Sequence, residues 1–273
     1  MGQPKLGVSL IGAQKAGSTS LAAWLAGHPQ LCHSKVKETH FWSAHEDASM
    51  QRAPEEVQAW FDDQFASRQP GQLLVDSSTS YSMAPEFPGV AGRLAEHNPE
   101  MKVLYLLRDP VARIRSHLGH DYRNRKIDAM DVAALETRPR YLARSRYFRQ
   151  LQEYDPLFPA SQIHVVVFEE LRESPADQLG AIEAFLGIEG GAAELPRLNT
   201  TEGRRGPTGV EASLAARNVR LPNRVQNQLR SRWGREATAV DLAPDTEAWL
   251  RSELTEDRAL LEERLGRSMP WPT

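Results

Sequence analysis

The chain of 273 residues contains a single cysteine, Cys32, and lacks any long apolar run. One cysteine cannot form an intramolecular disulfide, and Cys-rich metal motifs are excluded by the same count. The first apolar stretch, residues 6–11, is too short for the core of a signal peptide or for a membrane span. These absences favour a reducing compartment, and we expect a cytoplasmic protein that does not enter a membrane.

The sequence also lacks a large net charge, because 33 Lys and Arg residues stand against 36 Asp and Glu residues, which gives −3. A negative total without a zinc-finger, zipper or aromatic-basic signature argues against a nucleic-acid partner. The basic residues are nevertheless concentrated. Residues 108–149 hold eleven Lys or Arg and five acidic residues, and residues 201–240 hold eight Arg and three Glu. Two basic segments favour a compact ligand that carries several negative charges.

Hydrophobic residues make up 40% and charged residues 25%, as is typical of a globular protein. Short apolar runs alternate with segments of helical spacing, without hairpin dipeptides between them. We expect an α/β fold, a doubly wound and mostly parallel sheet with helices on both faces. The expected strands are residues 6–11, 73–75, 101–107 and 163–168. The expected helices begin with one that starts at Ser18 and continue with residues 90–97, 110–122, 145–154, 175–186, 210–233 and 244–265.

Residues 12–20 (GAQKAGSTS) lie between the first expected strand and the first expected helix. In that position backbone N–H groups and the helix dipole form a site for anions, and the hydroxyls of residues 18–20 are expected to cap the helix. Nucleoside triphosphatases also have two glycines five apart, but there a Lys follows the second Gly. Ser18 occupies that place here, and Lys15 lies inside the loop. A magnesium-dependent nucleotide kinase stays open as an alternative that must explain the displaced lysine.

At this loop the sequence resembles the sulfotransferases that use 3′-phosphoadenosine 5′-phosphosulfate (PAPS), most closely the heparan-sulfate-type and related bacterial branches. GAQKAGSTSL is similar to the family's 5′-phosphosulfate loop. The resemblance implies a P-loop-like fold. It also implies that the 5′-phosphate is bound by the backbone amides of Lys15, Ala16, Gly17, Ser18, Thr19 and Ser20. The hydroxyls of the last three residues are implied to bind it as well. It also places Lys15 near the bridging oxygen, where the ammonium would stabilise the departing 3′,5′-adenosine bisphosphate (PAP).

A second similarity begins where the strand expected at residues 101–107 ends. Arg108 and, eight residues later, Ser116 match the family pair that binds the ribose 3′-phosphate. The guanidinium of Arg108 offers a planar fork for phosphate oxygens, and Ser116 lies two helical turns further on, where it can face the same anion. Arg113 and Arg115 have the spacing of helix-surface residues.

A third, weaker similarity lies in residues 202–207 (EGRRGP), which resemble a loop that closes over the donor in the family. The family pattern is Lys-Gly-Arg-x-His-Pro, so two of its positions differ here. The resemblance implies a donor-binding role for Gly203 and Arg204, and Arg205 could share or replace the role of Arg204. A surface loop without a ligand is the alternative for this segment.

The acceptor side of the expected site begins at residues 35–42 (KVKETHFW), which resemble the family segment that carries the catalytic base. The resemblance assigns this role to Glu38, with His40 as the substitute. A base is needed because the acceptor hydroxyl or amine loses a proton as sulfur is attacked. The apolar neighbours Phe41 and Trp42 lead us to expect a raised pKa for Glu38. The alternative is a surface carboxylate paired with a neighbouring lysine.

Residues 75–81 (VDSSTSY) resemble a family segment in which a lysine contacts substrate, but Ser77 stands at the lysine position. That difference favours a smaller or less anionic acceptor than a densely sulfated polysaccharide. Six apolar residues are candidates for an acceptor-binding wall, although each could equally belong to the core, and these are Trp60, Phe61, Phe65, Met83, Phe87 and Tyr147.

The sequence therefore predicts one sulfotransferase domain over residues 1–273, with a core at 6–207 and a helical extension at 210–265. The predicted reaction is in-line transfer of a sulfuryl group from PAPS to a hydroxyl or amine of a small-molecule or carbohydrate acceptor, the chemistry of class EC 2.8.2. Positioning and charge cancellation suffice for such a transfer, and no metal is required. A module that binds PAP without catalysis is the other alternative. The sequence leaves the oligomeric state open.

Overall fold

The structure is a computed structural model, and it describes residues 4–43, 52–127, 135, 138–192, 194–196, 208–215, 217, 221–234 and 241–272. Its strands are β1 (Val8–Gly12), β2 (Leu31–His33), β3 (Leu73–Asp76), β4 (Lys102–Leu107) and β5 (Ile163–Val167). Its α-helices are α1 (Ser18–Gly27), α2 (Pro54–Gln64), α3 (Val90–His97), α4 (Pro110–Arg123), α6 (Arg140–Ala143), α7 (Tyr147–Leu151), α8 (Phe168–Glu173), α9 (Pro175–Leu186), α10 (Gly209–Ala215), α11 (Asn223–Trp233) and α12 (Pro244–Leu265).

The five strands form one sheet in the order β2-β3-β1-β4-β5, and every neighbouring pair is parallel. The central strands β1 and β4 are mostly apolar, as expected where both faces of a sheet are covered, and all five residues of β1 are buried. The predicted doubly wound, P-loop-like α/β fold is confirmed. The strand order reverses between β1 and β4, and open α/β sheets bind ligands beyond the carboxyl ends of their strands at such a point.

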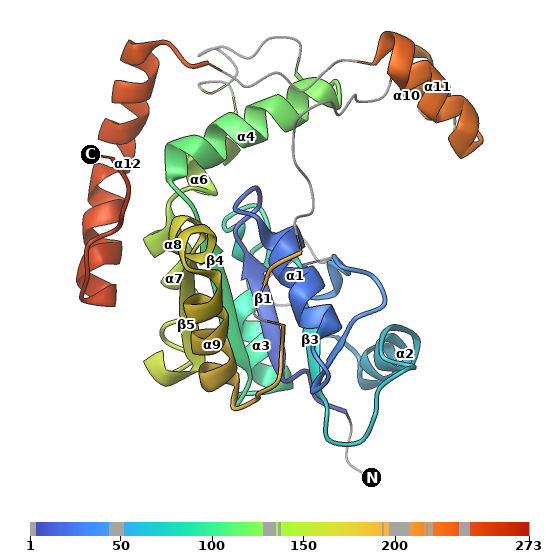
Figure 1. The fold of residues 1–273 in the computed structure, drawn as a ribbon, viewed down its shortest axis with the longest axis vertical. Helices are drawn as coiled ribbons and strands as arrows, with labels where there is room; N and C mark the ends of the chain where they lie inside the picture. The colour runs from blue at the N-terminus through green and yellow to red at the C-terminus, as the bar shows by residue number, and fades with distance from the viewer. Residues whose placement is uncertain are drawn as a thin grey trace.

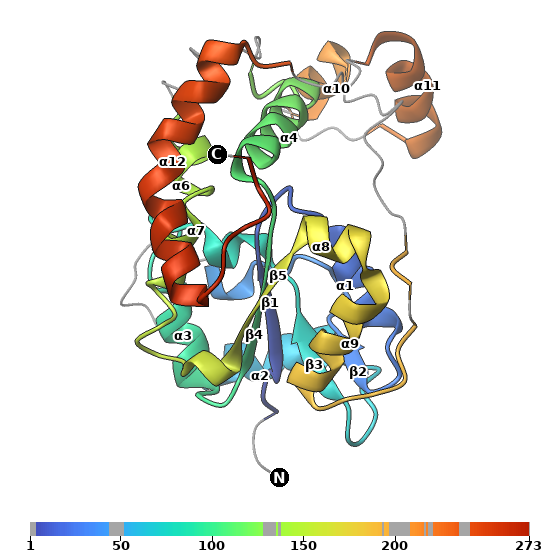
Figure 2. The ribbon, with the colours of Figure 1, turned by 60° about the vertical axis from the view of Figure 1, so that its left-hand side comes forward.

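Helices lie on both faces of the sheet (Figures 1 and 2). Helices α1, α8 and α9 cover one face, and α3, α7 and α12 lie on the opposite side. The segment after α12 turns back along that helix toward the start of α4, as Figure 2 shows. The C-terminal helix thus packs against α7 and α4, and the residues after it lie near the start of α4.

Some predicted elements differ from the observed ones. The helix predicted at residues 145–154 is shorter, since only Tyr147–Leu151 is helical. The helix predicted at residues 210–233 is two helices, α10 and α11, and Pro222 stands directly before the second. Strand β2 was not predicted, because a run of three residues that includes a histidine carries little strand signal.

The starts of α1 and α4 show how the chain is shaped near the sheet edge. Helix α4 begins with Pro110 in its first turn, and the carboxylate of Asp109 accepts a hydrogen bond from the Ala112 amide at 2.6 Å. Helix α1 has no side-chain cap, so the prediction that hydroxyls of residues 18–20 cap it is wrong. The residue before α1 is Gly17, in the left-handed conformation.

Within the described ranges, no helix is long and apolar enough to cross a bilayer.

Candidate functional site

A cavity of about 480 Å³ lies where the loop after β1 meets the residues that follow β4. Its volume is in the range of small-molecule and cofactor sites. The β1–α1 loop with the start of α1, the segments that follow β2, β3 and β4, and the helices α4 and α8 contribute residues to it. The lining residues are Gln14, Lys15, Gly17, Ser18, Thr19, Ser20, Glu38, Thr79, Arg108, Ser116, His120, Arg123 and Phe168.

The loop of residues 12–17 has a conformation that sequence alone does not reveal. Lys15 has φ 72° and Gly17 has φ 98°, both in the left-handed region that disfavours side chains. A Cβ atom on Gly17 would lie 2.8 Å from two ring carbons of Phe168, closer than such contacts occur. Position 17 therefore requires glycine for two reasons, its left-handed backbone conformation and the close approach of the Phe168 ring. The absence of a side chain allows the loop to pack against Phe168 at the start of α8.

The predicted donor-binding residues of the loop gather in the cavity, with one exception. Lys15, Gly17 and residues 18–20 line it. Ala16 does not, since it is fully buried and its amide donates to the Ala13 carbonyl at 3.1 Å. The Ser20 amide likewise donates to the Gly17 carbonyl, at 3.0 Å, so Ser20 contributes to the lining without a spare amide. Gly203, Arg204 and Arg205 lie outside the described residues.

The structure brings Arg108 and Ser116 into the same cavity, as their spacing predicts. The guanidinium of Arg108 lies 5.1 Å from the centre of the Phe168 ring and donates to the Lys15 carbonyl at 3.4 Å. Two further residues of α4, His120 and Arg123, also line the cavity. They were missed, although their spacing of four and seven residues from Ser116 places all three on one helix face.

Arg113 is buried, not a surface residue of α4, so that prediction is wrong. Its guanidinium donates to the Ser145 hydroxyl at 2.6 Å and to the carbonyls of Tyr141 and Gln14 at 2.6 and 3.4 Å. Burial lowers the pKa of Arg113 to about 10, so it stays charged at neutral pH. The Arg113 side chain thus connects α4 to the β1–α1 loop through its hydrogen bonds. These bonds fix the position of the loop relative to the start of α4.

Glu38 lines the cavity and accepts hydrogen bonds from two neighbours. The Lys37 ammonium lies 2.6 Å from Oε1, and the Thr79 hydroxyl lies 2.9 Å from Oε2. Partial burial alone would raise the pKa of Glu38, but Lys37, Thr79 and the nearby His40 outweigh it and lower the pKa. The expectation of a raised pKa is therefore wrong. Glu38 is a carboxylate at neutral pH and able to accept a proton.

His40 and the two aromatic residues after it lie away from the cavity. The His40 ring is 3.7 Å from Glu38 Oε2 and pairs with the Ser80 hydroxyl at 2.7 Å, but it is not part of the lining. Trp42 is buried, and Phe41 stacks on Trp60 with ring centres 4.6 Å apart. These rings pack into the core, which explains why they do not shield the Glu38 carboxylate.

The apolar residues considered for an acceptor-binding wall belong to the core. Five of the six are buried, and the sixth packs against the core while partly exposed. None of them lines the cavity around Glu38 and Lys15. The buried five are Trp60, Phe61, Phe65, Met83 and Tyr147, and the partly exposed residue is Phe87.

A buried network of hydrogen bonds centred on Asp76 lies next to the segment that carries Glu38. Asp76, at the end of β3, accepts hydrogen bonds from the hydroxyls of Tyr81, Thr39 and Ser78, and the Thr39 bond is 3.0 Å long. Burial raises the pKa of Asp76 to about 6, although these hydrogen bonds oppose the change. Ser77, at the position of the family lysine, is buried and pairs with His33 Nε2 at 2.8 Å. Ser77 therefore links the residue after β3 to β2, and it is not among the residues that line the cavity.

The raised pKa of Asp76 predicts a specific pH dependence of stability. The unfolded chain ionises this carboxyl near its usual pKa of about 4, whereas the folded chain does so near 6. Stability should therefore fall as pH rises from 4 to 6, because the unfolded state releases the proton first. Relative to an Asp76→Asn variant, the free energy of unfolding of the wild type should drop by on the order of 3 kcal/mol across this interval.

Urea unfolding at several pH values measures this difference. Asp62→Asn on α2, at an exposed carboxylate, is the control and should show the wild-type pH dependence. If the difference in free energy of unfolding between the wild type and Asp76→Asn does not change with pH, the assignment of the raised pKa to Asp76 is refuted.

Within the part of the chain that the structure describes, no three His, Cys, Asp or Glu side chains are grouped to hold a metal ion. The cavity instead carries positive charge from Lys15, Arg108 and Arg123, with Glu38 as its one carboxylate among the described lining residues. This excess of positive charge suits a ligand that carries several negative charges.

Comparisons with known proteins agree with this geometry. The sequence pattern described as "Sulfotransferase family" matches residues 8–191. Human heparan sulfate glucosamine 3-O-sulfotransferase 3B1 is 25% identical over 189 residues, which covers 66% of this chain and 45% of that protein. The human 3-O-sulfotransferase 5 is 27% identical over 191 residues, or 66% of this chain and 52% of that protein. The chain thus spans about half the length of the curated relatives that it matches.

Solved structures show the same fold. A sulfotransferase from Alicyclobacillus acidocaldarius superposes with a TM-score of 0.69 at 21% identity, covering 97% of this chain and 98% of that one. The sulfotransferase domain of the Synechococcus PCC 7002 olefin synthase gives a TM-score of 0.50 at 19% identity, covering 99% and 98%. At these identities the likeness concerns the fold.

Proposed function

We propose, from the premise that this chain belongs to the sulfotransferase family, that it transfers the sulfuryl group of PAPS to an acceptor hydroxyl or amine. Sulfuryl transfer in general follows from the family. The observation that supports PAPS as donor is the gathering of Lys15, Arg108, Ser116 and Glu38, which are far apart in the sequence, around one cavity.

The residues present fit the donor. A nucleotide with phosphate groups at its 3′ and 5′ positions needs two centres of positive charge and a flat surface for its base. Lys15 and the amides of Ser18 and Thr19 at the start of α1 supply one centre, because the first amides of a helix have no partner within the helix. Arg108, with Ser116 and Arg123 on α4, supplies the other. Phe168 offers an aromatic face in the same cavity.

In the proposed reaction, PAPS supplies an activated sulfuryl group whose bond to the 5′-phosphate breaks as the acceptor attacks sulfur. Glu38 accepts the acceptor's proton, which its ionised state at neutral pH allows. Thr79 and Lys37 hold the Glu38 carboxylate in place through their hydrogen bonds. Lys15 offsets the negative charge that develops on the leaving side. Arg108 and Ser116 fix the distant end of the nucleotide, so that donor and acceptor are held in line.

The acceptor is proposed to be a carbohydrate or small molecule that offers a hydroxyl or amine. The named relatives act on heparan sulfate, a carbohydrate. Here Ser77 replaces the family lysine and is bonded to His33. A less anionic acceptor than a densely sulfated chain is consistent with that replacement.

Incubation with PAPS labelled in its sulfuryl group tests the proposal. Carbohydrates and small hydroxyl or amine compounds are offered as acceptors, with EDTA present throughout. We expect transfer of label to an acceptor and stoichiometric release of PAP. Transfer of a phosphoryl group from magnesium-ATP to the same acceptors in a parallel reaction without EDTA, and no sulfuryl transfer from PAPS, would support the kinase alternative and refute the proposal.

A further inference from the structure

The C-terminal part of the chain contacts Asp109 and Glu169, which are next in sequence to the cavity-lining residues Arg108 and Phe168. Helix α12 ends at Leu265 and is followed by Gly266 in the left-handed conformation, and the residues after it turn back along the helix (Figure 2). Arg258 donates to the carbonyls of Pro272 and Met269 at 2.7 and 3.3 Å. Met269 and Trp271 are buried. We call residues 267–272 together with Arg251 of α12 the C-terminal strap.

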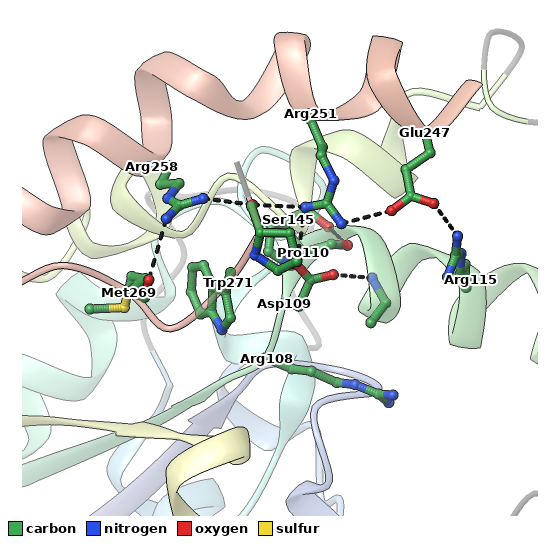
Figure 3. A network of polar contacts seen from close by, with 12 residues as sticks. Arg108, Asp109, Pro110, Arg115, Ser145, Glu247, Arg251, Arg258, Met269 and Trp271 are labelled. Atoms are coloured by element: carbon green, nitrogen blue, oxygen red, sulfur yellow. Dashed lines mark hydrogen bonds and ion pairs between the residues drawn. The ribbon is translucent and has the colours of Figure 1, made fainter. Parts of the chain in front are cut away.

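Arg251 connects this strap directly to the start of α4. Its guanidinium lies 3.3 Å from Asp109 Oδ2, 2.7 Å from Glu247 Oε1 and 3.0 Å from the Pro272 carbonyl. Figure 3 shows Arg251 between Asp109 on one side and Glu247 on the other. Asp109 is the residue directly after Arg108, and its other carboxylate oxygen binds the Ala112 amide. The ion pair therefore fixes the backbone from which Arg108 extends.

Trp271 reaches the same point by a second route. Its indole N–H donates to Glu169 Oε2 at 3.0 Å, and Glu169 Oε1 accepts from the Asp109 amide, also at 3.0 Å. The residue before Glu169 is Phe168, which lines the donor cavity. One carboxylate thus joins the strap, the peptide after Arg108 and the start of α8.

A third route passes through Tyr147. The rings of Tyr147 and Trp271 pack with centres 5.8 Å apart, and the Tyr147 hydroxyl donates to the Arg108 carbonyl at 2.8 Å. Both side chains are buried. The Asp109 carboxylate is thus held by Arg251 of the strap. The Asp109 amide and the Arg108 carbonyl are held by Glu169 and Tyr147, which both contact Trp271 of the strap.

We propose that the C-terminal strap positions Arg108 for the 3′-phosphate of the donor, with Arg251 and Trp271 as its positioning residues. The inference rests on the proposed function, because it assumes that Arg108 binds this phosphate. Neither positioning residue touches the nucleotide. They act by holding residues 108 and 109 in the one arrangement in which the guanidinium faces the cavity.

The test measures PAP and adenosine 5′-phosphate binding by calorimetric and displacement titration, because the two ligands differ only in the 3′-phosphate. For Arg251→Leu we expect about a tenfold loss of PAP affinity, as is typical when a partner that orients a ligand-binding group is removed. The affinity for adenosine 5′-phosphate should change less than about twofold. Trp271→Phe, which keeps the ring and removes the N–H donor, should move PAP affinity in the same direction.

Arg264→Leu is the matched control. Arg264 also lies on α12, its side chain is 16% exposed against 19% for Arg251, and it pairs with Asp155 on the surface, away from residues 108 and 109. This variant should bind both ligands like the wild type. In an Arg108→Ala background, Arg251→Leu should cause no further loss of PAP affinity, since the group that it positions is gone.

The outcomes separate the two proposals. If Arg251→Leu lowers the affinity for both ligands equally, or behaves like Arg264→Leu, the strap does not position Arg108 and the inference is overturned, while PAP binding by the wild type still stands. If the wild type itself does not bind PAP, the proposed function fails as well.

Discussion

Replacing Glu38 by Gln is expected to lower the rate of sulfuryl transfer about 1,000-fold, because general-base catalysis contributes factors of this order. The amide oxygen of Gln can still accept a hydrogen bond from Lys37 or Thr79, so the local structure should persist. PAP affinity and the thermal unfolding temperature should stay near their wild-type values. Single-turnover rates at saturating donor measure the effect on chemistry apart from binding.

The pH profile distinguishes a base from a residue with only a structural role. Because the pKa of Glu38 is lowered, kcat/KM of the wild type should not decline on the acidic side until the pH falls below about 4, the usual pKa of a glutamate. Glu55→Gln, at an exposed position of α2, is the control and should keep the wild-type rate. Undiminished turnover by Glu38→Gln would transfer the role of general base to another group.

Arg108→Ala is expected to weaken PAP binding at least about 100-fold, since two charge-assisted hydrogen bonds to a phosphate are lost. Arg108→Lys should fall between this variant and the wild type, because an ammonium keeps the charge but not the planar fork. The affinity for adenosine 5′-phosphate should fall much less than that for PAP. Calorimetric titration of both ligands provides the comparison.

Arg149→Ala is the control for Arg108→Ala. Arg149 belongs to the same basic segment of the sequence and is exposed on α7. It should leave PAP affinity unchanged. An equal loss in both variants would mean that the general positive field of this segment, and not a contact from Arg108, determines binding.

Much of the site could be predicted because its parts are local in sequence. The loop at residues 12–20 and Arg108 each follow a strand, and Ser116 lies on α4, the helix that follows Arg108. The carboxyl ends of parallel strands meet at one edge of the sheet. Glu38 was found by resemblance alone. The strands β1, β4 and β5 were evident as apolar runs, whereas β2 was too short to be recognised.

The remaining features depend on contacts between distant residues. Arg113 is buried because carbonyls of Gln14 and Tyr141 are there to accept its hydrogen bonds, and no pattern along α4 reveals them. The pKa of Glu38 follows from the side chains that face it in the folded chain, Lys37, Thr79 and His40. Thr79 lies 41 residues away in sequence, whereas the nearby Trp42 is buried in the core. Arg251 and Asp109 are 142 residues apart, so the strap is visible only in the folded chain.

Titration of the purified wild-type protein with PAP in EDTA, and separately with magnesium-ATP, tests the central claim most directly. It isolates the donor site from the unidentified acceptor. The account predicts micromolar PAP binding without magnesium and no comparable binding of magnesium-ATP. Absence of PAP binding, or a preference for magnesium-ATP, would contradict it and return the loop at residues 12–20 to the kinase interpretation.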